Sequence, residues 1–134
     1  FSLSYMKKIY DQLETEFNGM KIPVIFFTKG SHLWVEDIAK TGCDALSIDW
    51  NTDIRQTREK VGDRVAIQGD MNPAVLKGKE EEIIKEVQLI LDSYGAGPGH
   101  VFNLGHGITP DIDPDNVRVL VNSVHELSKK YHIK

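Results

Sequence analysis

Three consecutive stretches decide the fold of this chain: "RVAIQGD" (64–70), "KEEEIIKEVQLILDSYG" (79–95) and "HVFNLGHG" (100–107). The first and third are short, largely apolar runs of strand length. The middle stretch is longer, has its apolar residues at helical spacing and ends at Gly95, a typical residue for the end of a helix. A strand, a helix and a second strand of these lengths predict a right-handed crossover between two parallel strands.

The same alternation extends in both directions from this unit. "VIFFT" (24–28) and "ALSIDW" (45–50) are predicted strands, and the ranges 32–42, 52–62 and 113–132 are predicted helices. "VIFFT" is expected at an open edge of the sheet. A further helix is predicted at 1–17, with its apolar stripe formed by Leu3, Met6, Ile9, Leu13 and Phe17. The chain is therefore predicted to be α/β, with a leading helix and four βα units.

Four βα units fit two architectures, a small doubly wound sheet or half of a (β/α)8 (TIM) barrel of ~250 residues. Both folds place their sites at the carboxyl ends of the strands. A doubly wound sheet usually concentrates its ligand at one switch point, whereas a barrel uses several adjacent strands. Here all four predicted strands end in polar residues, which favours the half-barrel: Thr28-Lys29-Gly30-Ser31, Asp49-Trp50-Asn51, Gln68-Gly69-Asp70 and Gly105-His106-Gly107.

Composition narrows the possible partners and location. The 134 residues include 40% hydrophobic and 27% charged residues, as in a folded domain, and a net charge of -4 argues against nucleic-acid binding. No apolar run approaches the roughly 20 residues of a membrane span, so no membrane partner is expected. The single cysteine, Cys43, cannot form an internal disulfide, and a reducing cytoplasm is the expected location.

Several motifs carry a resemblance to a known family. The sequence resembles the carboxyl-terminal half of the uroporphyrinogen decarboxylase family in "SLSYMKKIY" (2–10), "FFTKGSH" (26–32), "SIDW" (47–50), "AIQGDMNPAVL" (66–76) and "GHVFNLGHGITPDIDPDNVRVLVNSVHELS" (99–128). The resemblance runs through nearly the whole chain, in order. It implies a TIM barrel of about twice this length, so that residues 1–134 would be its carboxyl-terminal portion, with the amino-terminal half absent.

The resemblance also implies an activity. Members of this family decarboxylate the four acetate side chains of uroporphyrinogen III to give coproporphyrinogen III in haem biosynthesis, without a cofactor. A porphyrinogen substrate, a homodimer of the full-length enzyme and a cytoplasmic location would follow. The family's proton donor and pyrrole-binding acid lie in the half that this chain lacks. No catalytic residue is therefore assigned here, and the chain alone is expected to be inactive.

Residues at the strand ends are the candidate substrate-binding group. The resemblance implies that His106 lines the active-site cleft and contacts a substrate carboxylate or a pyrrole nitrogen, and an imidazole can donate an N–H to a carboxylate in either charge state. Gly105 and Gly107 are expected to let the backbone turn and a ligand approach. Gln68 and Gly69 are expected to line the same cleft. A turn histidine bonded to local backbone groups is the alternative for His106.

Two further residues have two possible roles each, and the role of a third is open. Asp49 could orient a ligand N–H or hold a neighbouring loop by a charged hydrogen bond. Lys29 could attract an acidic substrate or lie in solvent. The family's pattern is Gln-Gly-Asn-x-Asp-Pro, whereas this sequence has Asp70 in place of the asparagine and Asn72 in place of the aspartate. The role of Asp70 is therefore open, while Asn72 before Pro73 is typical of a helix N-cap.

Two other functions remain as alternatives. The same superfamily contains zinc-dependent methyltransferases that act with corrinoid or thiol partners, but zinc favours cysteine and histidine ligands. The corresponding strand ends here read "KGSHL" and "LGHGI", and Cys43 precedes its strand, so no metal site is expected. The second alternative is a self-contained, doubly wound binding domain.

Overall fold

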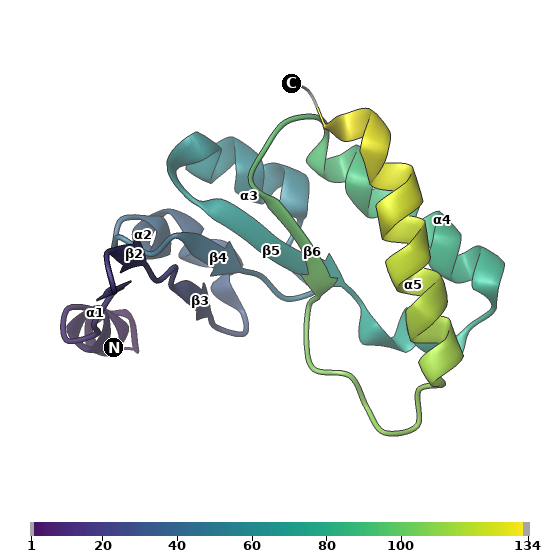
Figure 1. The fold of residues 1–134 in the computed structure, drawn as a ribbon, viewed down its shortest axis with the longest axis horizontal. Helices are drawn as coiled ribbons and strands as arrows, with labels where there is room; N and C mark the ends of the chain where they lie inside the picture. The colour runs from purple at the N-terminus through teal and green to yellow at the C-terminus, as the bar shows by residue number, and fades with distance from the viewer. Residues whose placement is uncertain (1, 133–134) are drawn as a thin grey trace.

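The structure, a computed structural model, describes residues 2–132. Its main sheet is parallel and contains β3 (Ile25–Phe27), β4 (Ala45–Ser47), β5 (Ala66–Met71) and β6 (His100–Leu104) in the order β3-β4-β5-β6. Each strand therefore pairs with the next one along the chain (Figure 1). As predicted, "VIFFT" supplies a strand, β3, at one edge of this sheet.

One helix follows each strand: α2 (Val35–Ala39), α3 (Ile54–Val61), α4 (Glu80–Tyr94) and α5 (Pro114–Leu127). Successive helices contact each other and form a continuous layer along the sheet, with α4 and α5 side by side (Figure 1). Aspartates cap two of them, since Asp53 accepts from Gln56 N and Asp113 accepts from Asp115 N. Shorter 3-10 turns lie at Gly62–Arg64, Pro73–Lys77 and Ser128–Tyr131.

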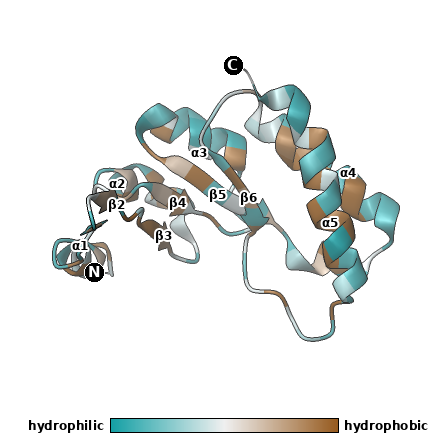
Figure 2. Cartoon of the chain, in the orientation of Figure 1, coloured by the Kyte–Doolittle hydropathy of each residue, from teal (hydrophilic) through white to brown (hydrophobic). Residues whose placement is uncertain are grey.

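The core lies between the sheet and this helical layer. Leu46, Ile67 and Val87 are at most 1% exposed there, and brown apolar segments mark these strands and helices in Figure 2. On the other face of the sheet Ile25 and Phe27 remain 46% exposed and Val101 42%. A doubly wound sheet is covered by helices on both faces, whereas a barrel has helices only outside. The sheet with its alternating helices is therefore consistent with half of a TIM barrel.

The helix predicted at 1–17 is wrong in its second half. Helix α1 covers Ser2–Tyr10, and a two-stranded hairpin follows, formed by β1 (Glu16–Phe17) and β2 (Met20–Lys21). Asn18 and Gly19, with φ of 51° and 76°, form its two-residue turn, which is the residue pair that such hairpins favour. The predicted stripe does not form one buried face, because Ile9 within α1 and Leu13 and Phe17 beyond it are all exposed.

The helix predicted at 32–42 is shorter than expected. A 3-10 turn at Ser31–Leu33 precedes α2, and Trp34 lies between the two elements. Ile38 and Ala39 are buried as the helical spacing predicted, but Leu33 and Trp34 are 72% and 57% exposed. Val35, the first residue of α2, is buried in their place.

Candidate functional site

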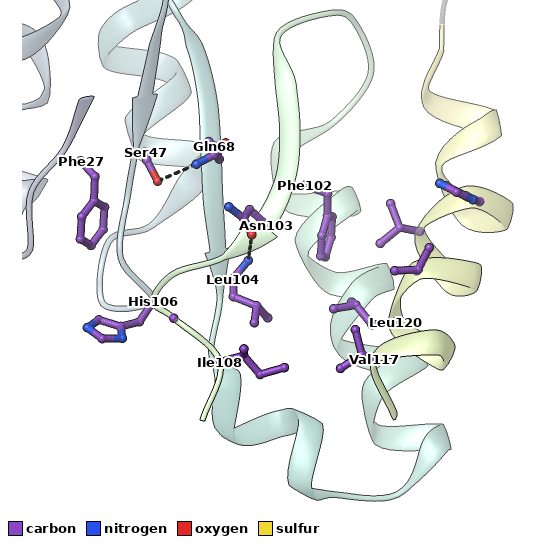
Figure 3. Close-up of a pocket in the computed structure, with 14 residues that line it drawn as sticks. Phe27, Ser47, Gln68, Phe102, Asn103, Leu104, His106, Ile108, Val117 and Leu120 are labelled. Atoms are coloured by element: carbon purple, nitrogen blue, oxygen red, sulfur yellow. Dashed lines mark hydrogen bonds between the residues drawn. The ribbon is translucent and has the colours of Figure 1, made fainter. Parts of the chain in front are cut away.

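The carboxyl ends of the four strands meet at one edge of the sheet, as parallel strands require. Gly105 N donates to Met71 O at 2.7 Å, which holds the end of β6 against the end of β5. Next to this edge lies an open pocket of about 670 Å³ (Figure 3). On the side of the sheet it is lined by Phe27 and by the polar residues Ser47, Gln68, Asn103 and His106. On the side of α5 its lining is apolar and includes Phe102, Leu104, Val117 and Leu120.

The two glycines around His106 have different surroundings. A Cβ on Gly105 would lie 2.4 Å from Trp50 N and 2.9 Å from the carbonyl carbon of Asp49. Gly105 is therefore required by the packing of the chain itself. The backbone that follows β4 occupies the space in which a ligand was predicted to approach. A Cβ on Gly107 would meet nothing within 4 Å, so only this glycine leaves open space beside the histidine.

His106 lies exposed at the pocket and contacts an aromatic ring. Its imidazole meets the Trp50 indole edge-on, with ring centroids 5.7 Å apart. The Lys29 ammonium lies 5.9 Å from the centroid of the same indole, a cation–π distance. Residues from the ends of β3, β4 and β6 thus form one cluster of Lys29, Trp50 and His106. Trp50 was not singled out from the sequence, although it adjoins the candidate Asp49.

Asp49 is buried and its carboxylate is fully used by the protein. It accepts from Gly30 N at 2.6 Å, Asn51 N at 3.0 Å and Thr52 Oγ1 at 3.0 Å. Burial disfavours the ionised form, but these hydrogen bonds outweigh it and hold the pKa of Asp49 below its ordinary value. The geometry favours the loop-holding role, because the carboxylate ties the loop after β3 to the end of β4.

Gln68 lines the pocket and Gly69 lies beside it in the sheet. Gln68 Nε2 is 3.2 Å from Ser47 Oγ on the neighbouring strand. Gly69 has φ of 124°, and a Cβ there would come within 2.6 Å of Ile48 O, so it serves close strand packing. Ser47 and Asn103 were not predicted from the sequence. Side chains alternate between the two faces of a strand, so the residues two positions before the candidates Asp49 and Gly105, which are Ser47 and Asn103, could have been expected on the same face.

Asp70, whose role the sequence left open, faces the helical layer. Its Oδ1 is buried and has no hydrogen-bond partner within residues 2–132. Burial raises the pKa of Asp70 to about 6, with a further contribution from the carboxylates of Asp53 and Glu86. Asn72 is the N-cap expected from its position before Pro73, since it accepts from Ala74 N at 3.0 Å.

Residues 2–132 show neither a cluster of metal ligands nor a membrane-spanning helix. Residues 2–132 contain no group of three or more His, Cys, Asp or Glu side chains that could hold a metal ion. Cys43 is buried, and burial raises the pKa of its thiol. Among the helices of this same range, none has the length and apolar character needed to cross a membrane.

Comparisons with known proteins identify relatives along the whole chain. A family model described as uroporphyrinogen decarboxylase (URO-D) matches residues 1–127. A uroporphyrinogen decarboxylase of Pseudomonas entomophila is 58% identical over 132 residues, and one of Pseudoalteromonas translucida is 54% identical. Both alignments cover 98% of this chain but only 37% of the relative.

A solved structure shares the fold. A methyltransferase from Methanosarcina mazei superposes with a TM-score of 0.72 over 94% of this chain and 35% of that one, at 22% identity. This likeness concerns the fold alone. The family model and the two relatives bear directly on ancestry, and together they show that the chain belongs to the uroporphyrinogen decarboxylase family.

Proposed function

We propose that this chain is the carboxyl-terminal portion of a TIM-barrel enzyme that decarboxylates the four acetate side chains of uroporphyrinogen III to give coproporphyrinogen III. The observation that carries the proposal is family membership over residues 1–127. Because the chain spans 37% of the length of the relatives it matches, the activity belongs to a longer protein. The chain alone is expected to be inactive.

The reaction needs no metal or organic cofactor if the substrate itself accepts electrons. Protonation of the pyrrole ring beside an acetate arm creates an electron sink, and the carboxyl group then leaves as carbon dioxide. The protein must bind the side-chain carboxylates, orient the ring and supply the proton. The proton donor and the pyrrole-binding acid are assigned to the part of the enzyme outside this chain.

Within this chain the proposed role is substrate binding. His106 is exposed at the pocket and can donate an N–H to a carboxylate, while Gln68 presents an amide to the same pocket. Gly107 leaves room beside the imidazole, Gly105 fixes the position of the turn, and Gly69 keeps β4 and β5 close. Asp49 acts indirectly by holding the loop that carries Lys29. A homodimer of the whole enzyme and a cytoplasmic location complete the proposal.

The direct test is a graft. This chain replaces the 132-residue stretch of the Pseudomonas entomophila enzyme to which it aligns, and conversion of uroporphyrinogen III is followed by chromatography of the oxidised products. We expect coproporphyrin from the graft and none from the chain alone. A folded graft without activity would contradict the proposal. A stable monomeric chain that binds a ligand alone would instead support the doubly wound domain.

Chelation and the zinc content of the graft distinguish the decarboxylase from the methyltransferase alternative. We expect the graft to retain its activity after dialysis against a chelator, because no set of thiol and imidazole ligands converges in residues 2–132. Stoichiometric zinc whose removal abolishes activity would favour the methyltransferase.

A further inference from the structure

One side chain in the pocket has an orientation fixed by the backbone. Asn103, on β6, has its Oδ1 2.8 Å from Leu104 N (Figure 3). A backbone N–H can only donate, so the amide atom that faces it must be the oxygen. The Nδ2 end, which carries two N–H donors, is then directed away from Leu104. Within residues 2–132 this nitrogen makes no hydrogen bond.

The surroundings of Asn103 favour a ligand that accepts hydrogen bonds. The side chain is exposed and lines the same pocket as Gln68 and His106. Gln68 is less restricted, because its partner Ser47 carries a hydroxyl that can donate or accept. Asn103 presents its two N–H donors on the side of the amide that faces away from Leu104.

We propose that Asn103 Nδ2 binds a side-chain carboxylate of the substrate and thereby contributes to substrate specificity. The inference rests on the proposed function, which supplies a substrate with carboxylate arms. Two N–H groups on one nitrogen can bond a carboxylate oxygen without adding a charge to the site. Gln68 pairs with Val101, and Asn103 lies two residues further along β6, so Asn103 and Gln68 share the face of the sheet that borders the pocket.

The test uses Asn103→Asp in the grafted enzyme. The substituted side chain has the same shape, and its oxygen can still accept from Leu104 N, but the donor group becomes an anion. We expect KM for uroporphyrinogen III to rise roughly tenfold or more, since a charge-assisted hydrogen bond is lost and repulsion is added. The melting temperature and kcat should change little by comparison. Asn103→Ala, which removes the donor without adding charge, should raise KM by a smaller factor.

The matched control is Asn122→Asp, which makes the same charge change on the exposed surface of α5 and away from the pocket. It should leave KM unaltered. An active graft in which both Asn103 variants keep the original KM would overturn the inference and leave the proposed function intact. A KM change of equal size in the control would also overturn it. An unaltered graft without activity would instead refute the proposed function.

Discussion

Polar groups at the two ends of the parallel sheet differ in their partners: at the amino end they bond one another, and at the carboxyl end several face a pocket. At the amino end, in the turn 95–99, Arg58 donates to the carbonyls of Tyr94 and Ala96 and lies over the Tyr94 ring at 4.3 Å. The Tyr94 hydroxyl donates to Pro98 O, and its ring stacks on His100 with centroids 4.3 Å apart. At the carboxyl end, Asn103 and His106 are exposed to an open pocket instead.

This difference separates stability from binding. Polar groups that bond one another fix the chain, whereas groups left facing a pocket remain available to a ligand, and barrels usually divide their two ends in this way. Asp49 and Gly105 are exceptions at the carboxyl end, because both hold the loops together. Substitutions at the two ends, made in the grafted enzyme, should therefore affect different quantities.

The largest effect is expected at Gly105, where the carboxyl end is held together. Gly105→Ala places a methyl group against the backbone of Trp50 and Asp49, and we expect the free energy of unfolding to fall by about 3 kcal/mol. Urea unfolding measures it. Gly107→Ala is the matched control, with no atom within 4 Å of the added carbon, and should change stability by less than about 0.5 kcal/mol. Equal effects of the two would contradict the close packing at Gly105.

The next effect concerns binding at the same end. His106→Ala should lower kcat/KM for uroporphyrinogen III about 100-fold, equivalent to about 2.7 kcal/mol, because a donor to the substrate is lost. The melting temperature should stay nearly constant, since the imidazole is exposed and its one ring contact within residues 2–132 is the T-shaped contact with Trp50. A large loss of stability with unchanged turnover would assign His106 to the turn rather than to the substrate.

A substitution of Arg58 tests the contribution of the amino end of the sheet to stability. Arg58→Met removes two hydrogen bonds to carbonyls and a cation–π contact, and we expect a loss of about 2 kcal/mol in the free energy of unfolding with kcat unchanged. The control is Arg118→Met, which removes an exposed ion pair with Asp115 that should contribute less than about 0.5 kcal/mol. If Arg58→Met lowers kcat while stability is retained, the division between the two ends fails.

The smallest effect is a gain in stability at Asp70. Its pKa is about 6 in the folded state, above the ordinary 3.8, so the folded protein binds this proton more tightly than the unfolded chain. The contribution of Asp70 to stability is therefore fully present below about pH 4 and is lost as the pH rises through 6. Asp70→Asn should stabilise the protein by about 1 kcal/mol at pH 7.5, a value reduced for partial exposure, and have little effect at pH 3.5.

Urea midpoints of both proteins at the two pH values check this. A variant with the same pH dependence as the original protein would show that another group is responsible. Because the pKa has a second contribution from neighbouring carboxylates, Glu86→Gln is a useful companion and should give a smaller change of the same sign.

The sequence predicted the order of strands and helices because short apolar runs and their intervening helices repeat regularly. It failed at residues 11–17, where the local preference of Asn18-Gly19 for a hairpin turn outweighed the helical stripe. The strand ends were predicted less well, since "ALSIDW" (45–50) and "HVFNLGHG" (100–107) each extend three residues past the ends of β4 and β6 at Ser47 and Leu104. The separate functions of Gly105 and Gly107 could not be predicted, because they depend on Trp50, which is distant in sequence. The orientation of the Asn103 amide depends likewise on one backbone hydrogen bond.

Because each strand of the main sheet after β3 pairs with the strand that precedes it in the chain, the sheet can assemble in the order of synthesis on the ribosome. Pairing between consecutive units closes short loops, which costs less entropy than distant pairing. Ile25 and Phe27, on the first of these strands, are still exposed after all four have paired. In the barrel proposed above, this apolar face and the free edge of β3 are where strands from outside this chain would pack and pair.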